Sequence, residues 1–188
     1  MGFPAFPCQG IRIGEGSTKL HIEAFLKKRP SSRWVLLGNH AVMSDEQLWT
    51  AWIQAARNDL RNRMVARSID AEFIRYLAGT HHISEAFSRA GLQASQSTAW
   101  VVCLPEAQGL ENDLGHVQPV AEELQDFRAS LDVLVEALGW SFETMHMRYS
   151  IEAAKQLGVD AEGWDEPRGH ESITAHILMA DDQSSSHR

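Results

Sequence analysis

The chain has 188 residues, of which 44% are hydrophobic and 22% charged, and its formal net charge is −8 at pH 7. These proportions are ordinary for a globular protein, and the length suits one domain better than two. No apolar run reaches the ~18 residues that a membrane span needs, which argues against a membrane protein. Cys8 and Cys103 are too few for a disulfide framework, so we expect a cytoplasmic protein with Cys103 as a buried thiol.

Positive charge is concentrated in the first half of the chain. Residues 1–91 hold twelve Lys or Arg against eight Asp or Glu, a net of +4, and residues 92–188 hold five against seventeen, a net of −12. Attraction to phosphate depends on local charge, so a basic face on an acidic protein can still bind nucleic acid. The alternative is that two oppositely charged faces only solvate the protein.

Strands and helices alternate through the first 104 residues. In chain order, apolar periodicity and turn residues predict strands over 9–13, 33–38 and 98–104, and helices over 19–28, 44–61, 70–78 and 82–90. Ser44 followed by Gln47 is a capping pair that opens the longest of these helices. Gly79 and Gly91 end the two short helices. The 98–104 segment is apolar at both its odd and its even positions, as expected for a strand buried on both faces.

The second half is expected to be mainly helical. After a loop over 105–118, a helix begins at Pro119 and ends at Gly139, followed by a helix over 150–157, a loop over 163–169 and an apolar segment over 173–180. The fold class is therefore α/β (α+β), with one compact domain over residues 1–181 and a small central sheet packed with several helices. Residues 182–188 are expected to form a disordered tail.

The six tryptophans divide into two groups. Trp34, Trp49, Trp52 and Trp100 fall in apolar strands or stripes and are interpreted as core residues. Trp140 and Trp164 lie beside glycines at chain breaks, where an aromatic side chain could instead anchor a partner protein.

Motifs for catalysis, metals or nucleotides are weak. The GEGSTK segment (residues 14–19) has the ingredients of a phosphate-binding loop in the wrong order, and the chain has no G-x-S-x-G. His81 and His82 are neighbours, so they cannot both face one metal from the start of a helix. In the C-terminal third, His146, His170 and His176 lack zinc-site spacing. We therefore expect no enzyme activity, cofactor or metal, although a small metal-dependent hydrolase built on that third is the rival class.

The segment from Arg61 to Gly91 carries most of the functional signal. It combines a cluster of arginines, two short capped helices and a histidine pair, without any nucleophile or acid–base motif. Such a segment is typical of a binding surface, for RNA or for a partner protein.

The same segment resembles a known family. Residues 66–92 (ARSIDAEFIRYLAGTHHISEAFSRAGL) and the following STAWVVCLPE are similar to the smallest KEOPS/EKC subunit, the PRPK-binding (TPRKB-like) protein of animals and its archaeal and fungal relatives, and we expect an archaeal member. The residues that match the family pattern are Ser68, Glu72, Ala78, Gly79, Ile83, Glu85, Ala86 and Gly91.

The resemblance implies a non-catalytic subunit with two kinds of partner. It would bind the atypical kinase/ATPase of KEOPS, contact the other subunits indirectly, and help deliver tRNA by its 3′ CCA end for threonylcarbamoyladenosine modification. The residues predicted to contact RNA are Arg67, Arg75, His81, His82 and Ile83, with both arginines expected to be exposed; the kinase interface is not assigned. Many archaeal relatives carry Arg and Gln in place of the two histidines, so RNA affinity here is expected to depend on pH. The alternative is a kinase-binding scaffold that binds no RNA.

Overall fold

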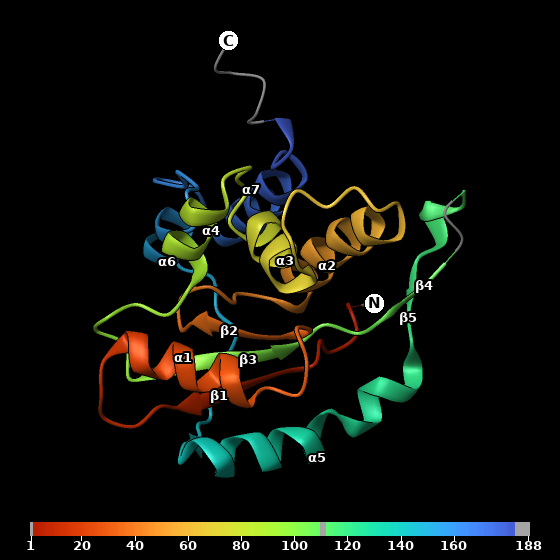
Figure 1. Ribbon diagram of the computed structural model, residues 1–188. Coiled ribbons are helices and arrows are strands. Elements are labelled where there is room, and N and C mark those ends of the chain that lie inside the picture. Colours follow the sequence, from red (N-terminus) through yellow and green to blue (C-terminus); the bar gives the residue numbers. More distant parts are fainter. Residues whose placement is uncertain (1, 110–111, 183–188) are drawn as a thin grey trace.

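The structure is a computed structural model that describes residues 2–109 and 112–182 (Figure 1). Its centre is an antiparallel sheet in the order β2-β3-β1-β6. The four strands are β1 (Cys8–Arg12), β2 (Trp34–Gly38), β3 (Thr98–Cys103) and β6 (Ser141–Phe142). The first three lie within a residue of the predicted strands, and the two-residue β6 was not predicted.

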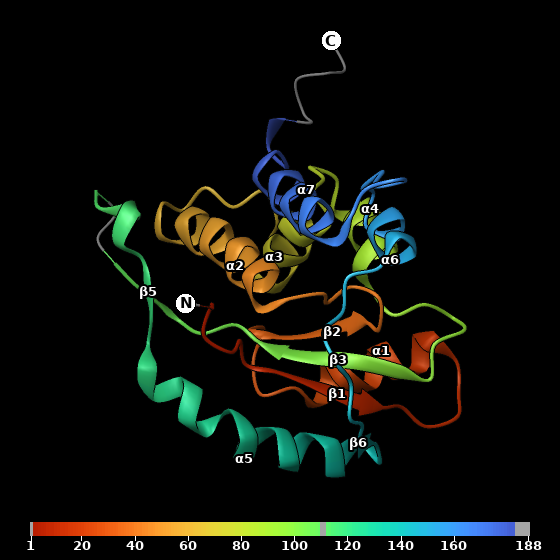
Figure 2. The same cartoon turned by 180° about the vertical axis from the view of Figure 1, so that it is seen from behind.

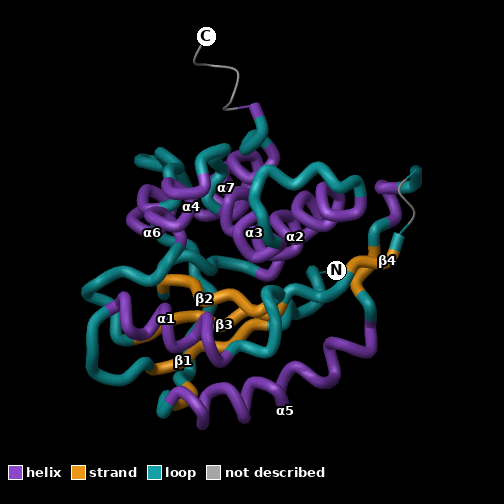
Figure 3. Tube along the Cα trace, in the orientation of Figure 1, coloured by secondary structure: helices purple, strands orange, loops and turns teal. Residues whose placement is uncertain are grey.

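Helices cover both faces of the sheet, which confirms the α/β (α+β) class (Figures 1 and 2). One face carries α2 (Asp45–Leu60), α3 (Ile69–Leu77), α4 (Ile83–Ala90), α6 (Ile151–Gln156) and α7 (Glu166–Leu178). The other face carries α1 (Thr18–Lys28) and α5 (Ala121–Leu138) (Figure 3). The side chains of β3 alternate between these layers: Trp100 and Val102 join the larger core, and Ala99 and Val101 join the smaller one. This placement explains why the strand is apolar at both its odd and its even positions.

Two of the predicted capping signals are confirmed, the start of α2 and the end of α3. The Ser44 hydroxyl accepts from the Gln47 backbone N–H (3.1 Å), and the buried Gln47 side chain accepts from Met43 N–H (2.8 Å) and donates to the Ala41 carbonyl (3.1 Å). Gly79 follows α3 with a φ of 59°, a left-handed conformation that glycine adopts without steric strain.

Two predictions in the second half are wrong. Pro119 does not open a helix; it lies in β5 (Gln118–Pro119), which pairs with β4 (Ala107–Gln108) in a small hairpin inside the predicted loop. The hairpin also contains a 3₁₀ turn, Leu114–His116. α5 therefore begins two residues later, at Ala121.

The loop predicted over 163–169 is wrong in its second part, because α7 begins at Glu166. The Asp165 carboxylate accepts from the Arg168 backbone N–H (3.2 Å) and caps the helix. Gly169 lies within α7, at a position where the Tyr149 ring leaves no room for a Cβ. The closing apolar stretch predicted over 173–180 is the buried end of this helix, with Ile173 and Ile177 in the core.

Five of the tryptophans are buried: Trp34, Trp49, Trp52, Trp100 and Trp140. Trp140 packs against Phe25 with its ring nearly parallel, so it is a core residue rather than an exposed anchor. Trp164 is half-buried, with the Arg168 guanidinium 4.7 Å from its ring centre. Cys103 is also half-buried, less enclosed than predicted. Of the predicted disordered tail, residues 183–188 lie outside the described residues.

Candidate functional site

The arginine cluster lies at the end of α2 and in the loop that joins it to α3. Arg63 and Arg67 are exposed, and within the described residues neither side chain forms a hydrogen bond or ion pair. Arg61 is held in place because its guanidinium donates to the Arg57 carbonyl (3.2 Å) and to the Asn58 amide oxygen (2.7 Å). Two guanidinium groups are therefore available to a ligand on this loop.

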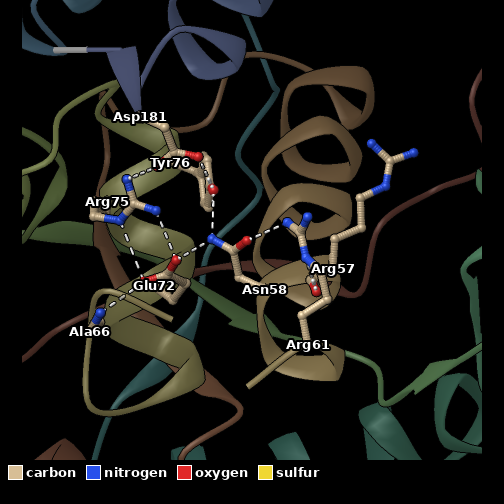
Figure 4. Close-up of polar contacts among 8 residues, drawn as sticks. All are labelled: Arg57, Asn58, Arg61, Ala66, Glu72, Arg75, Tyr76 and Asp181. Atoms are coloured by element: carbon tan, nitrogen blue, oxygen red, sulfur yellow. Dashed lines mark hydrogen bonds and ion pairs between the residues drawn. The ribbon is translucent and has the colours of Figure 1, made fainter. Parts of the chain in front are cut away.

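A buried polar network fixes the loop from beneath (Figure 4). The Glu72 carboxylate, with a fully buried side chain, accepts from the Ala66 backbone N–H (2.9 Å), the Asn58 amide (2.8 Å) and the Arg75 guanidinium (2.7 Å). The Asn58 amide also donates to the Tyr76 hydroxyl (2.7 Å). Because Ala66 immediately precedes Arg67, Glu72 sets the position of the exposed arginine.

Arg75 is not exposed, so that part of the prediction is wrong. Its side chain is 0% exposed, and its guanidinium also donates to Asp181 beyond the end of α7 (2.8 Å). Burial alone would lower the pKa of Arg75, but the hydrogen bond and charge of Glu72 raise it, so the group stays cationic. Burial and the hydrogen bond to Asp181 (2.6 Å) raise the pKa of Tyr76 to about 12. Arg75 therefore closes an internal ion-pair network.

The histidine turn lies at the other end of α3. His82 is exposed and occupies the N-cap position of α4, while His81 and Ile83 are half-buried. The nine residues of α3 span about 13 Å and are all buried, so they separate this turn from Arg67. The five residues predicted to contact RNA therefore divide among a loop, a buried network and a distant turn.

Two of the other histidines, His176 and His40, contact backbone carbonyls. His176 in α7 contacts the carbonyls of Ala78 and Leu157 through Nε2, at 2.9 Å each. His40 contacts the Arg89 carbonyl at 2.6 Å.

Within residues 2–109 and 112–182, no group of three or more His, Cys, Asp or Glu side chains is placed to hold a metal ion. In that same part of the chain, no helix has both the length and the apolar character to cross a membrane.

Sequence reasoning missed the supporting residues of this site. Glu72 stood in the matched family pattern, but nothing local indicated a buried carboxylate. Asn58 lies on α2, fourteen residues from Glu72, and Asp181 lies 106 residues from Arg75. The one available signal was the i, i+3 spacing of Glu72 and Arg75, which is typical of an ion pair on a helix.

Comparison with known proteins identifies the family. A family model described as kinase binding protein CGI-121 matches residues 17–148, which include every element from α1 to β6. No curated protein matches the chain. The matched region covers well over half of the sequence and contains the arginine loop, α3 and the histidine turn. The chain therefore belongs to the CGI-121 family of kinase-binding proteins, the family of the KEOPS subunit that its sequence resembles.

Proposed function

We propose that this chain is a non-catalytic KEOPS subunit that binds the atypical kinase/ATPase of the complex and holds the 3′ CCA end of tRNA during threonylcarbamoyladenosine modification. Membership of a kinase-binding family supports the kinase partner. The observation that supports RNA binding is the pair of exposed arginines, Arg63 and Arg67, left without acidic partners on a protein of net charge −8.

Single-stranded RNA suits this arrangement. Guanidinium groups bind phosphate by charge-assisted hydrogen bonds and stack on unpaired bases, so two of them on one loop can hold a short flexible end. The loop is fixed by Glu72 through Ala66, so little conformational freedom is lost on binding. Arg75 has no part in this proposal because its donors point into the network. RNA contact by His81, His82 and Ile83 stays a prediction for a separate surface.

Titrations of tRNA, followed by fluorescence anisotropy, test the RNA proposal. We expect Arg67→Glu to weaken binding at least tenfold, since one lost charge-assisted hydrogen bond is worth about 1.5 kcal/mol. Lys19→Glu, which makes the same charge change at an exposed site on α1, is the matched control and should have a much smaller effect. Removing the terminal CCA should weaken the wild-type protein as much, with little further loss in Arg67→Glu.

Each outcome assigns one of the competing functions. If tRNA without CCA binds as tightly as intact tRNA, the chain does not recognise the 3′ end. If Lys19→Glu weakens binding as much as Arg67→Glu, the attraction is only to net charge. Loss of affinity in His82→Ala, with none in Arg67→Glu, would move the RNA site to the histidine turn. A chain that binds the kinase but no tRNA would be the scaffold, and stoichiometric bound zinc with hydrolysis would favour the small hydrolase.

A further inference from the structure

An apolar groove lies at the open edge of the sheet, between α1 and the α3–α4 pair. β2 is the edge strand, because it stands first in the sheet order and, within the described residues, pairs with β3 alone. The groove has a volume of about 290 Å³, with β2 residues at its floor and apolar side chains from both helical layers in its walls. The wall residues include Phe25, Leu26, Ala71, Ile74 and Phe87. Leu26 is 49% exposed and Phe87 45% exposed, although both are large apolar residues.

The register of the sheet shows which backbone groups of β2 face this groove. Leu104 N–H donates to the Arg33 carbonyl (2.8 Å), and Cys103 N–H donates to the Pro7 carbonyl beside β1 (2.9 Å). Backbone direction alternates along an antiparallel strand, so the even-numbered residues of β3 bond β2 and the odd-numbered residues bond β1. Val35 pairs with Val102, so Val35 bonds β3, and Leu36 directs its N–H and C=O to the open edge.

At Leu36 both backbone groups face the open edge, whereas the carbonyls of Trp34 and Gly38, the outward-facing residues on either side, are occupied. The Trp34 carbonyl accepts from the Arg29 guanidinium (2.9 Å), and the Gly38 carbonyl accepts from Ala41 N–H (3.1 Å). Within the described residues, the Leu36 N–H and C=O have no hydrogen-bond partner. Asp70 in the groove wall pairs one carboxylate oxygen with Arg29 (2.6 Å), and its other oxygen is buried without a partner.

We propose that this groove binds a short extended segment of the kinase partner, which adds one residue of antiparallel strand beside Leu36. The inference rests on the proposed kinase binding and assigns a surface to it. One residue of an extended chain satisfies an N–H and a C=O together, whereas a helix uses its backbone groups internally. The segment carries apolar side chains that cover Leu26 and Phe87, and one further side chain with a hydroxyl or ammonium group that supplies the donor Asp70 lacks.

The groove does not suit the other available partners. RNA would place phosphates beside apolar walls and the Asp70 carboxylate, and Arg29, the cation in the lining, is already neutralised by its ion pair with Asp70. In a second copy of this chain, β2 lies at the floor of its own groove, so helical walls would meet before the two edges do. The kinase segment is therefore the occupant that the geometry favours.

Affinity for the KEOPS kinase of the same organism, measured by calorimetry with the full chain, tests the groove. Leu26→Glu and Phe87→Glu put a charge on each rim, and because both side chains are half-exposed the fold should be kept. We expect each to weaken kinase binding at least tenfold. Leu20→Glu is the matched control, since Leu20 is on the same helix, is 62% exposed and lies outside the groove. It should change affinity less than twofold.

Amide exchange measured by NMR reports the strand pairing directly. The Leu36 amide should exchange fast in the free protein, and should become protected when the kinase is bound. If wild-type protein does not bind the kinase, the proposed kinase-binding function is refuted, and so is the kinase segment as the occupant of the groove. If wild-type protein binds and both rim variants bind equally well, the groove is overturned while the function stands.

Two further results would overturn the proposed occupant. Loss of binding in the rim variants without protection of Leu36 in the complex would show that the kinase covers the groove without strand pairing. A concentration-dependent dimer of the free protein that Leu26→Glu abolishes, seen by sedimentation, would assign the groove to a second copy.

Discussion

Replacing Arg75 should destabilise the protein strongly, although the sequence indicated an exposed arginine. Arg75→Met removes the cation that neutralises Glu72, whose carboxylate is then buried with only an amide and a backbone N–H as partners. Breaking a buried ion pair in this way costs about 3–5 kcal/mol, against a total stability of about 5–15 kcal/mol. For a domain of this length, that loss corresponds to a fall in Tm of about 6–20 °C. Arg75→Glu would add a second buried carboxylate and should not fold.

Urea unfolding followed by tryptophan fluorescence and circular dichroism measures this loss. Arg67→Met is the matched control, because it removes the same charge from an exposed site and should change stability by less than about 0.5 kcal/mol. Asp181→Asn should lose at most about 1 kcal/mol, since the Asp181 side chain is 53% exposed. The double variant Glu72→Gln/Arg75→Met should be more stable than Arg75→Met alone, because it leaves no unpaired buried carboxylate. Arg75→Met with the stability of Arg67→Met would refute the structural role of the network.

Two further predictions concern the contact of α7 with the end of α3. Gly79→Ala should destabilise the protein more than Gly139→Ala. Both glycines have a positive φ, which costs an alanine about 1–2 kcal/mol. Only at Gly79 would the new Cβ also meet the His176 ring. Equal losses in urea unfolding would contradict that contact. Burial lowers the pKa of His176, so its stabilising effect is full above about pH 6.5 and is lost as pH falls through the lowered pKa. Wild-type Tm should therefore fall more between pH 7.5 and 5.5 than that of His176→Gln. Parallel falls would show that other groups account for the change, such as the half-buried His40, whose pKa burial also lowers.

The elements that the sequence predicted well are those whose signals are local. Ser44 and Gln47 are three residues apart, Gly79 stops α3 through its own φ, and β3 is apolar on both faces within six residues. Each of these signals acts through neighbouring residues, so periodicity and capping rules are sufficient to find it.

The elements that were missed depend on contacts between distant segments. Pro119 has the right residue type for a helix start, but pairing with Ala107 holds it in a strand. Gly169 falls in the predicted loop, but it is a glycine inside α7 because the Tyr149 ring, twenty residues earlier in the chain, leaves no room for a side chain there. The groove beside Leu36 combines residues of α1, β2, α3 and α4, and no single stretch of sequence contains it.

The arginines show the same limit in the candidate site. Four of the eight acidic residues in the first 91 form ion pairs with arginines there: Asp59 with Arg33, Asp70 with Arg29, Glu72 with Arg75 and Glu85 with Arg89. These ion pairs leave the net charge of residues 1–91 at +4, but they determine which basic side chains remain without an acidic partner. Arg75 is drawn inside because Glu72 is three residues away and Asp181 closes over it from the far end of the chain. The side chains of Arg63 and Arg67 have no such partners within the described residues, so both remain uncompensated cations on the loop that Glu72 holds in place.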